Sequence, residues 1–231
     1  MNIPLSKRLQ ACAAQILPGN RVADIGCDHG YLGIYLLTKG IASSVIAADI
    51  NEMPLQSAVR NAEKFGVQDN ITFYLSDGVK NIPRDFDTLV CAGMGADTMI
   101  SILDAAPWLK NEQYRLILQC QSRRPELRKY LYSNGFFIRS ETLAQDGKFI
   151  YPITEVIYSP AEPLTPGQYH ITPALLESKS PLLPAFYDRV VDGMRTTVEG
   201  LSRTGGEKYD YYCNILQELT ELEGQIYGDR S

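Results

Sequence analysis

The sequence of 231 residues lacks the features that mark membrane and metal-binding proteins. Its apolar runs fall short of the ~20 residues that a membrane span needs, and its N-terminus has no apolar signal core. It has two histidines and five cysteines, and no two cysteines are spaced as C-x-x-C. Structural zinc sites need such clusters. We therefore expect a cytoplasmic protein with no membrane contact, no bound metal and reduced, mostly buried thiols.

The net negative charge lies in the last third of the chain. Residues 1–159 hold 16 Lys and Arg and 16 Asp and Glu, whereas residues 160–231 hold 6 and 11. The net charge of −5 therefore belongs to the second segment. Overall acidity argues against a nucleic-acid partner, but this distribution leaves room for a basic patch on the first segment.

Strand and helix patterns alternate over the first segment. Short apolar runs predict strands at 21–25, 44–48, 71–75, 86–91 and 114–119. Helical spacing predicts helices at 5–17, 30–39, 52–65 and 124–133. A further helix is predicted after the fourth strand and its loop, and it ends at about residue 105. Strands that alternate with helices form a parallel, doubly wound sheet. Two further strands, at 136–143 and 150–158, are joined only by a short turn and should form an antiparallel hairpin. This predicts the α/β, Rossmann-like plan of class I methyltransferases.

The second segment has a different character. Five prolines between residues 159 and 181 predict an irregular connection. Apolar residues then recur every three or four positions over 182–202 and 207–227, which predicts an antiparallel helical hairpin or short coiled coil. We therefore divide the chain into a methyltransferase domain, 1–159, and a linker with a helical-hairpin domain, 160–231. The hairpin is either a packing appendage or an arm that grips substrate.

The segment Asp24-Ile-Gly-Cys-Asp-His-Gly30 joins the first predicted strand to its helix. Its glycines fit the turn of a nucleotide-binding βαβ unit. A dinucleotide site needs a further glycine where this chain has Asp28, whose carboxylate would repel a pyrophosphate. An acid there suits a cationic ligand without phosphate, such as S-adenosyl-L-methionine (SAM). The alternative is a plain turn whose acids cap the helix.

Two more acids follow predicted strands. Asp49 ends the second strand, where a carboxylate can accept hydrogen bonds from both ribose hydroxyls. Asp77 follows the third strand and can accept from the adenine amino group, while Gly78 permits a tight turn. Ligands of open α/β sheets bind at the carboxyl ends of the strands. The three acidic motifs together predict a SAM site, although Asp77 alone would be interpreted as a helix cap.

The loop Cys91-Ala-Gly-Met-Gly-Ala-Asp97 follows the fourth predicted strand. It lacks the Asn-Pro-Pro-aromatic signature of methyltransferases that act on exocyclic amines. Its backbone carbonyls and one soft methionine suit a flat aromatic acceptor. A close packing turn is the alternative.

In these motifs the chain resembles a known family, the bacterial methyltransferases that modify N1 of adenine at position 22 of tRNA. The matching motifs are Leu5-Ser-Lys-Arg-Leu9, the turn from Asp24 to Leu32, Ala92-Gly-Met-Gly95 and Asp146-Gly-Lys-Phe149. The resemblance implies a Rossmann-like domain, a coiled-coil C-terminal domain, SAM as cofactor and tRNA as partner. Where the family commonly has Gln-Pro-Asn, this chain has Gln119-Cys-Gln121.

The motifs and the resemblance together assign roles to individual residues. The expected cofactor contacts are Asp24, Gly26, Cys27, Asp28, Gly30, Asp49, Ile50, Asp77, Gly78, Ala92 and Gly93. The candidates beside the reacting atoms are His29, Asp28, Gly93, Met94 and Asp97. The candidate RNA contacts are Lys7, Arg8, Arg123, Arg124, Arg128 and Lys129. We expect a monomer or a weak homodimer.

Two other functions fit the sequence. One is a SAM-dependent methyltransferase that acts on a protein or a small molecule. The other is a nonenzymatic protein that binds SAM or RNA, which would explain the altered Gln119-Cys-Gln121 segment. Formation of 1-methyladenosine in tRNA would separate both from the first function.

Overall fold

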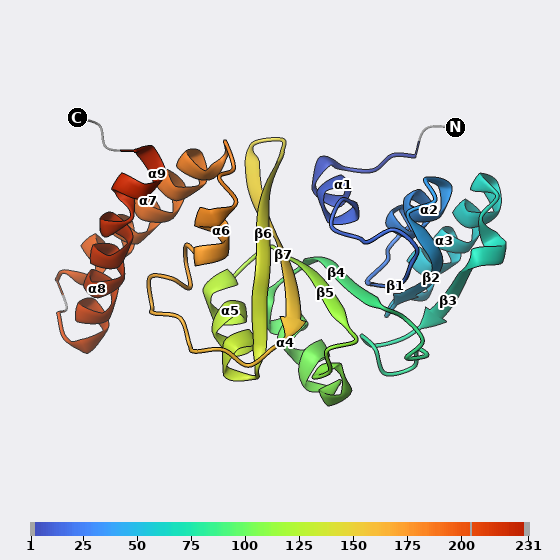
Figure 1. The fold of residues 1–231 in the computed structure, drawn as a ribbon. Coiled ribbons are helices and arrows are strands. Elements are labelled where there is room, and N and C mark those ends of the chain that lie inside the picture. The colour runs from blue at the N-terminus through green and yellow to red at the C-terminus, as the bar shows by residue number, and fades with distance from the viewer. Residues whose placement is uncertain (1–2, 204, 229–231) are drawn as a thin grey trace.

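The computed structural model describes residues 3–203 and 205–228, so residues 1–2, 204 and 229–231 of the expected domains lie outside the described residues. Seven strands form one mixed sheet in the order β3-β2-β1-β4-β5-β7-β6. β1 to β5 are parallel, and β7 pairs antiparallel with both β5 and β6. Figure 1 shows this sheet with helices on both faces and further helices beyond its β6 edge. The predicted fold class, a parallel sheet closed by an antiparallel hairpin, is confirmed.

The strands begin and end within a few residues of the predicted ranges. They are β1 Asn20–Ile25, β2 Ala42–Asp49, β3 Ile71–Leu75, β4 Thr88–Met94, β5 Arg115–Cys120, β6 Phe136–Asp146 and β7 Phe149–Tyr158. The helices are α1 Lys7–Ala13, α2 Tyr31–Thr38, α3 Glu52–Phe65, α4 Ala96–Asp104, α5 Arg124–Ser133, α6 Pro173–Glu177, α7 Leu183–Leu201, α8 Glu207–Glu221 and α9 Glu223–Tyr227, with short 3₁₀ turns at Gln68–Asn70 and Pro107–Leu109.

Alternate residues of the central strands β1, β2, β4 and β5 enter two different apolar clusters. In β1, Val22 packs with α1, α2 and α3 on one face, whereas Ala23 and Ile25 pack with α4 and α5 on the other. Strands buried on both faces carry continuous apolar runs, which is why the central strands could be recognised. None of the described helices is long and apolar enough to cross a membrane.

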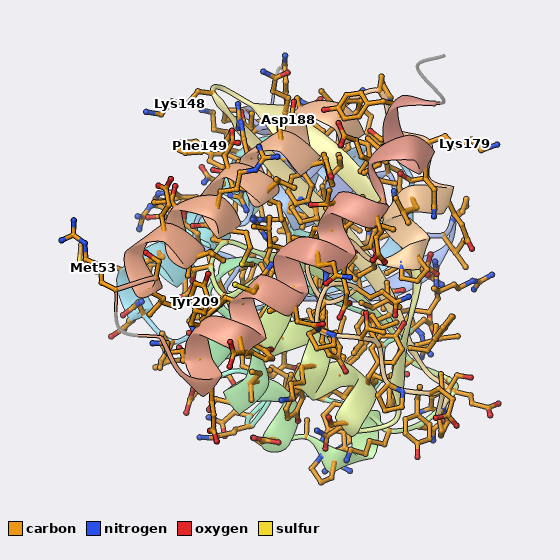
Figure 2. The ribbon with its side chains drawn as sticks, turned by 90° about the vertical axis from the view of Figure 1, so that its left-hand side faces the viewer. Met53, Lys148, Phe149, Lys179, Asp188 and Tyr209 are labelled. Carbon is orange, nitrogen blue, oxygen red and sulfur yellow. The ribbon has the colours of Figure 1, made fainter. Side chains whose placement is uncertain are left out.

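The C-terminal helices have a cluster of their own. Phe186 and Val191 of α7 pack against Ile215 and Leu219 of α8, and Figure 2 shows the two helices side by side. The predicted helical hairpin is confirmed, but its second arm breaks at Leu222 into α8 and α9. The short helix α6 was not predicted within the proline-rich connection. Ile150 of β7 also belongs to this cluster, and the domain boundary after residue 159 stays a prediction.

A buried ion pair connects α5 to β6 of the β6–β7 hairpin. Arg128 is 3% exposed and donates to both carboxylate oxygens of Glu141 in β6, at 2.7 and 3.0 Å. It also donates to the carbonyls of Tyr169 and His170, at 2.9 Å each. The expected RNA contact of Arg128 is therefore wrong, because its guanidinium is buried and both of its terminal nitrogens are hydrogen-bonded within the protein.

We predict that Arg128→Ala lowers the free energy of unfolding by about 3–5 kcal/mol, because it leaves the Glu141 carboxylate buried without its counter-ion. Arg195→Ala is the control, since Arg195 forms an exposed pair with Asp192 at 3.4 Å and should cost less than about 1 kcal/mol. Urea denaturation measures both. A loss below about 1 kcal/mol for Arg128→Ala would contradict this role.

Candidate functional site

The carboxylate of Asp49, at the end of β2, joins two turns at the carboxyl edge of the sheet. Its Oδ2 accepts the Asp28 N–H at 3.0 Å, and its Oδ1 accepts the Asn51 N–H at 2.9 Å. Asp28 has a positive φ of 51°, a conformation that Asp tolerates better than most residues. Asp49 therefore fixes the turn after β1 relative to the turn after β2.

A cavity of about 380 Å³ opens beside Asp49. Residues from the ends of β1, β2, β3 and β4 and from α4 line it: Ile25, Gly26, Asp49, Ile50, Ser76, Asp77, Gly78, Lys80, Met94, Asp97, Thr98, Ser101, Ile102 and Ala105. Its volume lies in the range of small-molecule sites. Asp77 is exposed and pairs with Lys80 at 2.5 Å. The acids that follow β2 and β3 thus share one cavity, as the sequence predicts.

A second cavity, of about 270 Å³, lies on the other side of Gly26. Its lining comes from α1, the β1–α2 turn, the end of β4 and the segment after β5: Arg8, Leu9, Asp24, Gly26, Cys27, Asp28, His29, Tyr31, Leu32, Ala92, Gly93, Met94 and Gln121. Gly26 and Met94 line both cavities. Gly26 has a positive φ of 74°, which favours glycine. A Cβ atom there would also collide with the Met94 methyl carbon, so that side chain would have to shift.

Asp24 is the buried acid of the second cavity. It is 4% exposed, and its Oδ2 has no hydrogen-bond partner among the described residues. The pKa of Asp24 is raised to about 7, mainly by burial and secondly by the negative charge of Asp49. A hydrogen bond from the Gly33 backbone acts in the opposite direction and lowers the pKa. An unpartnered buried carboxyl group that lines a cavity is suited to a cationic ligand group.

Comparison with known proteins agrees with this geometry. A family model described as "Methyltransferase domain" matches residues 5–154. The tRNA (adenine(22)-N(1))-methyltransferase of Bacillus subtilis is 37% identical over 148 residues, which are 63% of this chain and 62% of that protein. A provisionally named tRNA methyltransferase of Mycoplasma genitalium is 37% identical over 64% of this chain and 68% of that protein. The chain belongs to the tRNA (adenine(22)-N(1))-methyltransferase family.

Solved structures extend the similarity to the C-terminal helices. A Streptococcus pneumoniae protein, assigned provisionally as a tRNA (m1A22) methyltransferase, is 27% identical with a TM-score of 0.85, covering 96% of this chain and 100% of that one. Its structure in complex with SAM is 28% identical with a TM-score of 0.79 and the same coverage. In sequence, the chain spans somewhat less than two thirds of the B. subtilis relative, 62%.

Most of the residues expected at the cofactor and the reacting atoms lie around the two cavities. Gly30 lines neither cavity: its φ is 74°, and a Cβ there would lie 2.8 Å from the Ala58 Cβ, so it serves the packing of α2 on α3. Asp97 lines the first cavity but is exposed and bound by Arg123 at 2.8 and 2.9 Å. His29 is half-exposed, and its Nε2 lies 3.7 Å from Asp28 Oδ1.

The RNA candidates fall into different environments. Lys7 and Lys129 are exposed. Arg123 is exposed but bound by Asp97 and by Glu126 at 3.3 Å. Arg124 is half-buried, with its guanidinium carbon 5.3 Å from the centre of the Phe186 ring. Lys7 and Lys129 are therefore better placed to meet phosphates than the two arginines.

Sequence reasoning missed the role of Gln119, the fully buried residue next to the end of β5. Its Oε1 accepts from Arg8 Nη1 at 2.5 Å and from the Gly93 N–H at 3.0 Å. Its Nε2 is buried without a partner among the described residues. The signal was present in the sequence, because a polar residue at the end of an apolar strand in a parallel sheet lies at the ligand-binding edge.

The pKa of Asp24 predicts a pH dependence of stability. The folded-state pKa of about 7 exceeds the ordinary value of about 4, so the folded protein holds more protons between these values. The free energy of unfolding should therefore fall as pH rises through this window, by at most about 1.4 kcal/mol per pH unit.

Asp24→Asn removes this titration and should flatten the dependence. Chemical denaturation at pH 5, 6 and 7, each compared between the wild type and Asp24→Asn, measures the difference. Parallel pH profiles for the two proteins would show that Asp24 titrates normally.

Proposed function

We propose that this protein transfers the methyl group of SAM to N1 of adenine 22 in tRNA. The observation that carries the proposal is the pair of acid-lined cavities that meet at Gly26 and Met94. The family's named activity, and the relative solved with SAM, support the same reaction.

The residues present fit the cofactor. Asp49 keeps free lone pairs on both carboxylate oxygens after accepting two backbone N–H groups, and these can accept ribose hydroxyls. Asp77 borders the same cavity and can accept from the adenine amino group. Asp24 offers an unpartnered oxygen to the ammonium of the amino-acid tail. The joint acidity of the site disfavours nucleotides that carry pyrophosphate.

The acceptor side is built from the end of β4. SAM, when bound, supplies a methyl group activated by a sulfonium. Gly93 has a positive φ of 89°, and its N–H is bound by Gln119, so the loop is held rigidly for alignment. Neutral adenine has a lone pair at N1, so attack needs no general base. We assign stabilisation of the positive charge that the ring gains to backbone carbonyls of the loop and to the Asp28 carboxylate, which lines the same cavity as Gly93.

The decisive assay incubates the protein with labelled SAM and an unmodified tRNA transcript, followed by nucleoside analysis. The account predicts 1-methyladenosine at position 22 and none in a transcript whose adenine 22 is replaced by guanine. Labelled protein or small molecules, with unlabelled tRNA, would instead support a different acceptor. Binding of SAM without methyl transfer would support a nonenzymatic role.

Asp49→Asn should weaken SAM binding about tenfold or more, because hydrogen bonds to a charged acceptor contribute about 1.5–3 kcal/mol. Isothermal titration calorimetry measures this directly. Asp69→Asn is the matched control, since Asp69 is an exposed acid in the turn before β3. Equal affinities of Asp49→Asn and the wild type would rule out Asp49 as a cofactor ligand.

Lys7→Glu should weaken tRNA binding and reduce the slope of log affinity against log salt by about one unit. Lys7 lies on α1 next to Arg8, whose side chain lines the second cavity together with Gly93 of β4. Lys39→Glu is the control, because Lys39 caps the far end of α2, at the opposite edge of the sheet. Fluorescence anisotropy with labelled tRNA at several salt concentrations measures both variants. If Lys7→Glu and Lys39→Glu showed the same slope of log affinity against log salt, Lys7 would not contact the RNA.

A further inference from the structure

The β6–β7 hairpin extends well past the rest of the sheet. β5 pairs with β7 only over the four residues Thr154 to Ile157, whereas β6 pairs with β7 as far as Phe149. The outer half of the hairpin therefore projects, and Figure 1 shows it standing between α1 and the C-terminal helices. Strand alternation gives it two faces: Ile150 joins the cluster of the C-terminal helices, and Ile153 joins the cluster of α1.

The face toward α1 carries a continuous row of aromatic and cationic side chains. Lys148 Nζ lies 5.3 Å from the centre of the Phe149 ring, and the Phe149 and Tyr151 ring centres are 6.1 Å apart. The Arg8 guanidinium carbon lies 5.9 Å from the centre of the Tyr151 ring. Figure 2 shows Lys148 and Phe149 together at the tip of the hairpin. We call Lys148, Phe149, Tyr151 and Arg8 the hairpin row.

The inner end of the hairpin row lies at the acceptor side of the site. Arg8 lines the second cavity together with His29 and Gly93, and it is held there by Gln119. The outer end is open, because Phe149 is 52% exposed while its neighbour Ile150 is 6% exposed. The row thus leads from open surface to the cavity that faces the acceptor.

We propose that Phe149 and Tyr151 form a stacking platform for the RNA bases that flank the target adenine. This inference rests on the proposed function, because extrusion of a base from structured RNA leaves its neighbours unstacked. Aromatic faces bind such bases irrespective of sequence, and Lys148 and Arg8 add positive charge for the adjoining phosphates. The carboxylates of Asp146 at the hairpin tip and Asp28 at the cavity repel closely spaced phosphates. The Phe149 and Tyr151 rings are therefore expected to contact the faces of bases and not the RNA backbone.

Replacement of Phe149 tests the platform without disturbing the core. Phe149→Ala should weaken binding of unmodified tRNA about tenfold, in line with the contribution of one stacked base, and leave SAM affinity unchanged. Phe149→Trp should retain tRNA affinity, whereas Phe149→Leu should not restore it, because leucine is apolar but has no aromatic face. Leu17→Ala is the control and should bind as the wild type does, because Leu17 is also exposed, at 49%, but precedes β1 at the opposite end of the strands from the site.

A double-mutant cycle identifies the stacked base. The tRNA carries an abasic nucleotide on the 5′ or the 3′ side of the target adenine. If Phe149 stacks on the missing base, Phe149→Ala should cause no further loss with that tRNA.

Wild-type affinity of Phe149→Ala, full rescue by leucine, or additive losses with both abasic tRNAs would overturn the platform. These measurements report binding and not turnover, so they stand apart from the assay for 1-methyladenosine. Failure of that assay in the wild type would reject the proposed function, whereas a failed cycle would reject the platform alone.

Discussion

The site depends on one carboxylate. Asp49 accepts one backbone N–H from the β1–α2 turn and one from its own β2–α3 turn, and this bridge holds Asp28 in a left-handed conformation. The β1–α2 turn borders both cavities and the β2–α3 turn borders the first. The bridge therefore sets the distance between Asp49, the acid proposed to bind the ribose, and Asp24 and Asp28 in the second cavity. The same negative charge acts on Asp24, where it adds to burial in raising the pKa to about 7.

The contact of Gly26 with Met94 is the second constraint. It separates the two cavities at the point where a long ligand would have to pass. A ligand that fills both cavities must displace the Met94 side chain, and an unbranched thioether adapts at little cost. The protein thus combines a rigid, acidic floor with one adaptable side chain above it, a combination suited to holding a cation beside an aromatic acceptor.

Much of this arrangement could be predicted from sequence because it follows strand ends. Asp24, Asp49, Asp77 and Gly93 each lie at or just after the end of a recognisable apolar strand, and parallel strands bring their ends together. The hairpin was recognisable for the same local reason, since Asp146-Gly147 joins two strand-like runs.

Contacts between distant segments could not be predicted in this way. Arg128 resembles a solvated cation on an amphipathic helix, and only the fold brings Glu141 against it. The link from Arg8 to Gln119 spans 111 positions, and no local pattern indicates it. The row from Lys148 to Arg8 exists because the β6–β7 hairpin projects beyond β5. That projection follows from the short pairing between β5 and β7, which no local pattern indicates.

The most direct test of the central claim is a crystal structure with S-adenosyl-L-homocysteine, the demethylated product of SAM. The account predicts ribose hydroxyls within hydrogen-bond distance of Asp49, the amino group of the tail beside Asp24, and Met94 moved off Gly26. A ribose bound away from Asp49, or a ligand confined to one cavity with Met94 still over Gly26, would contradict it.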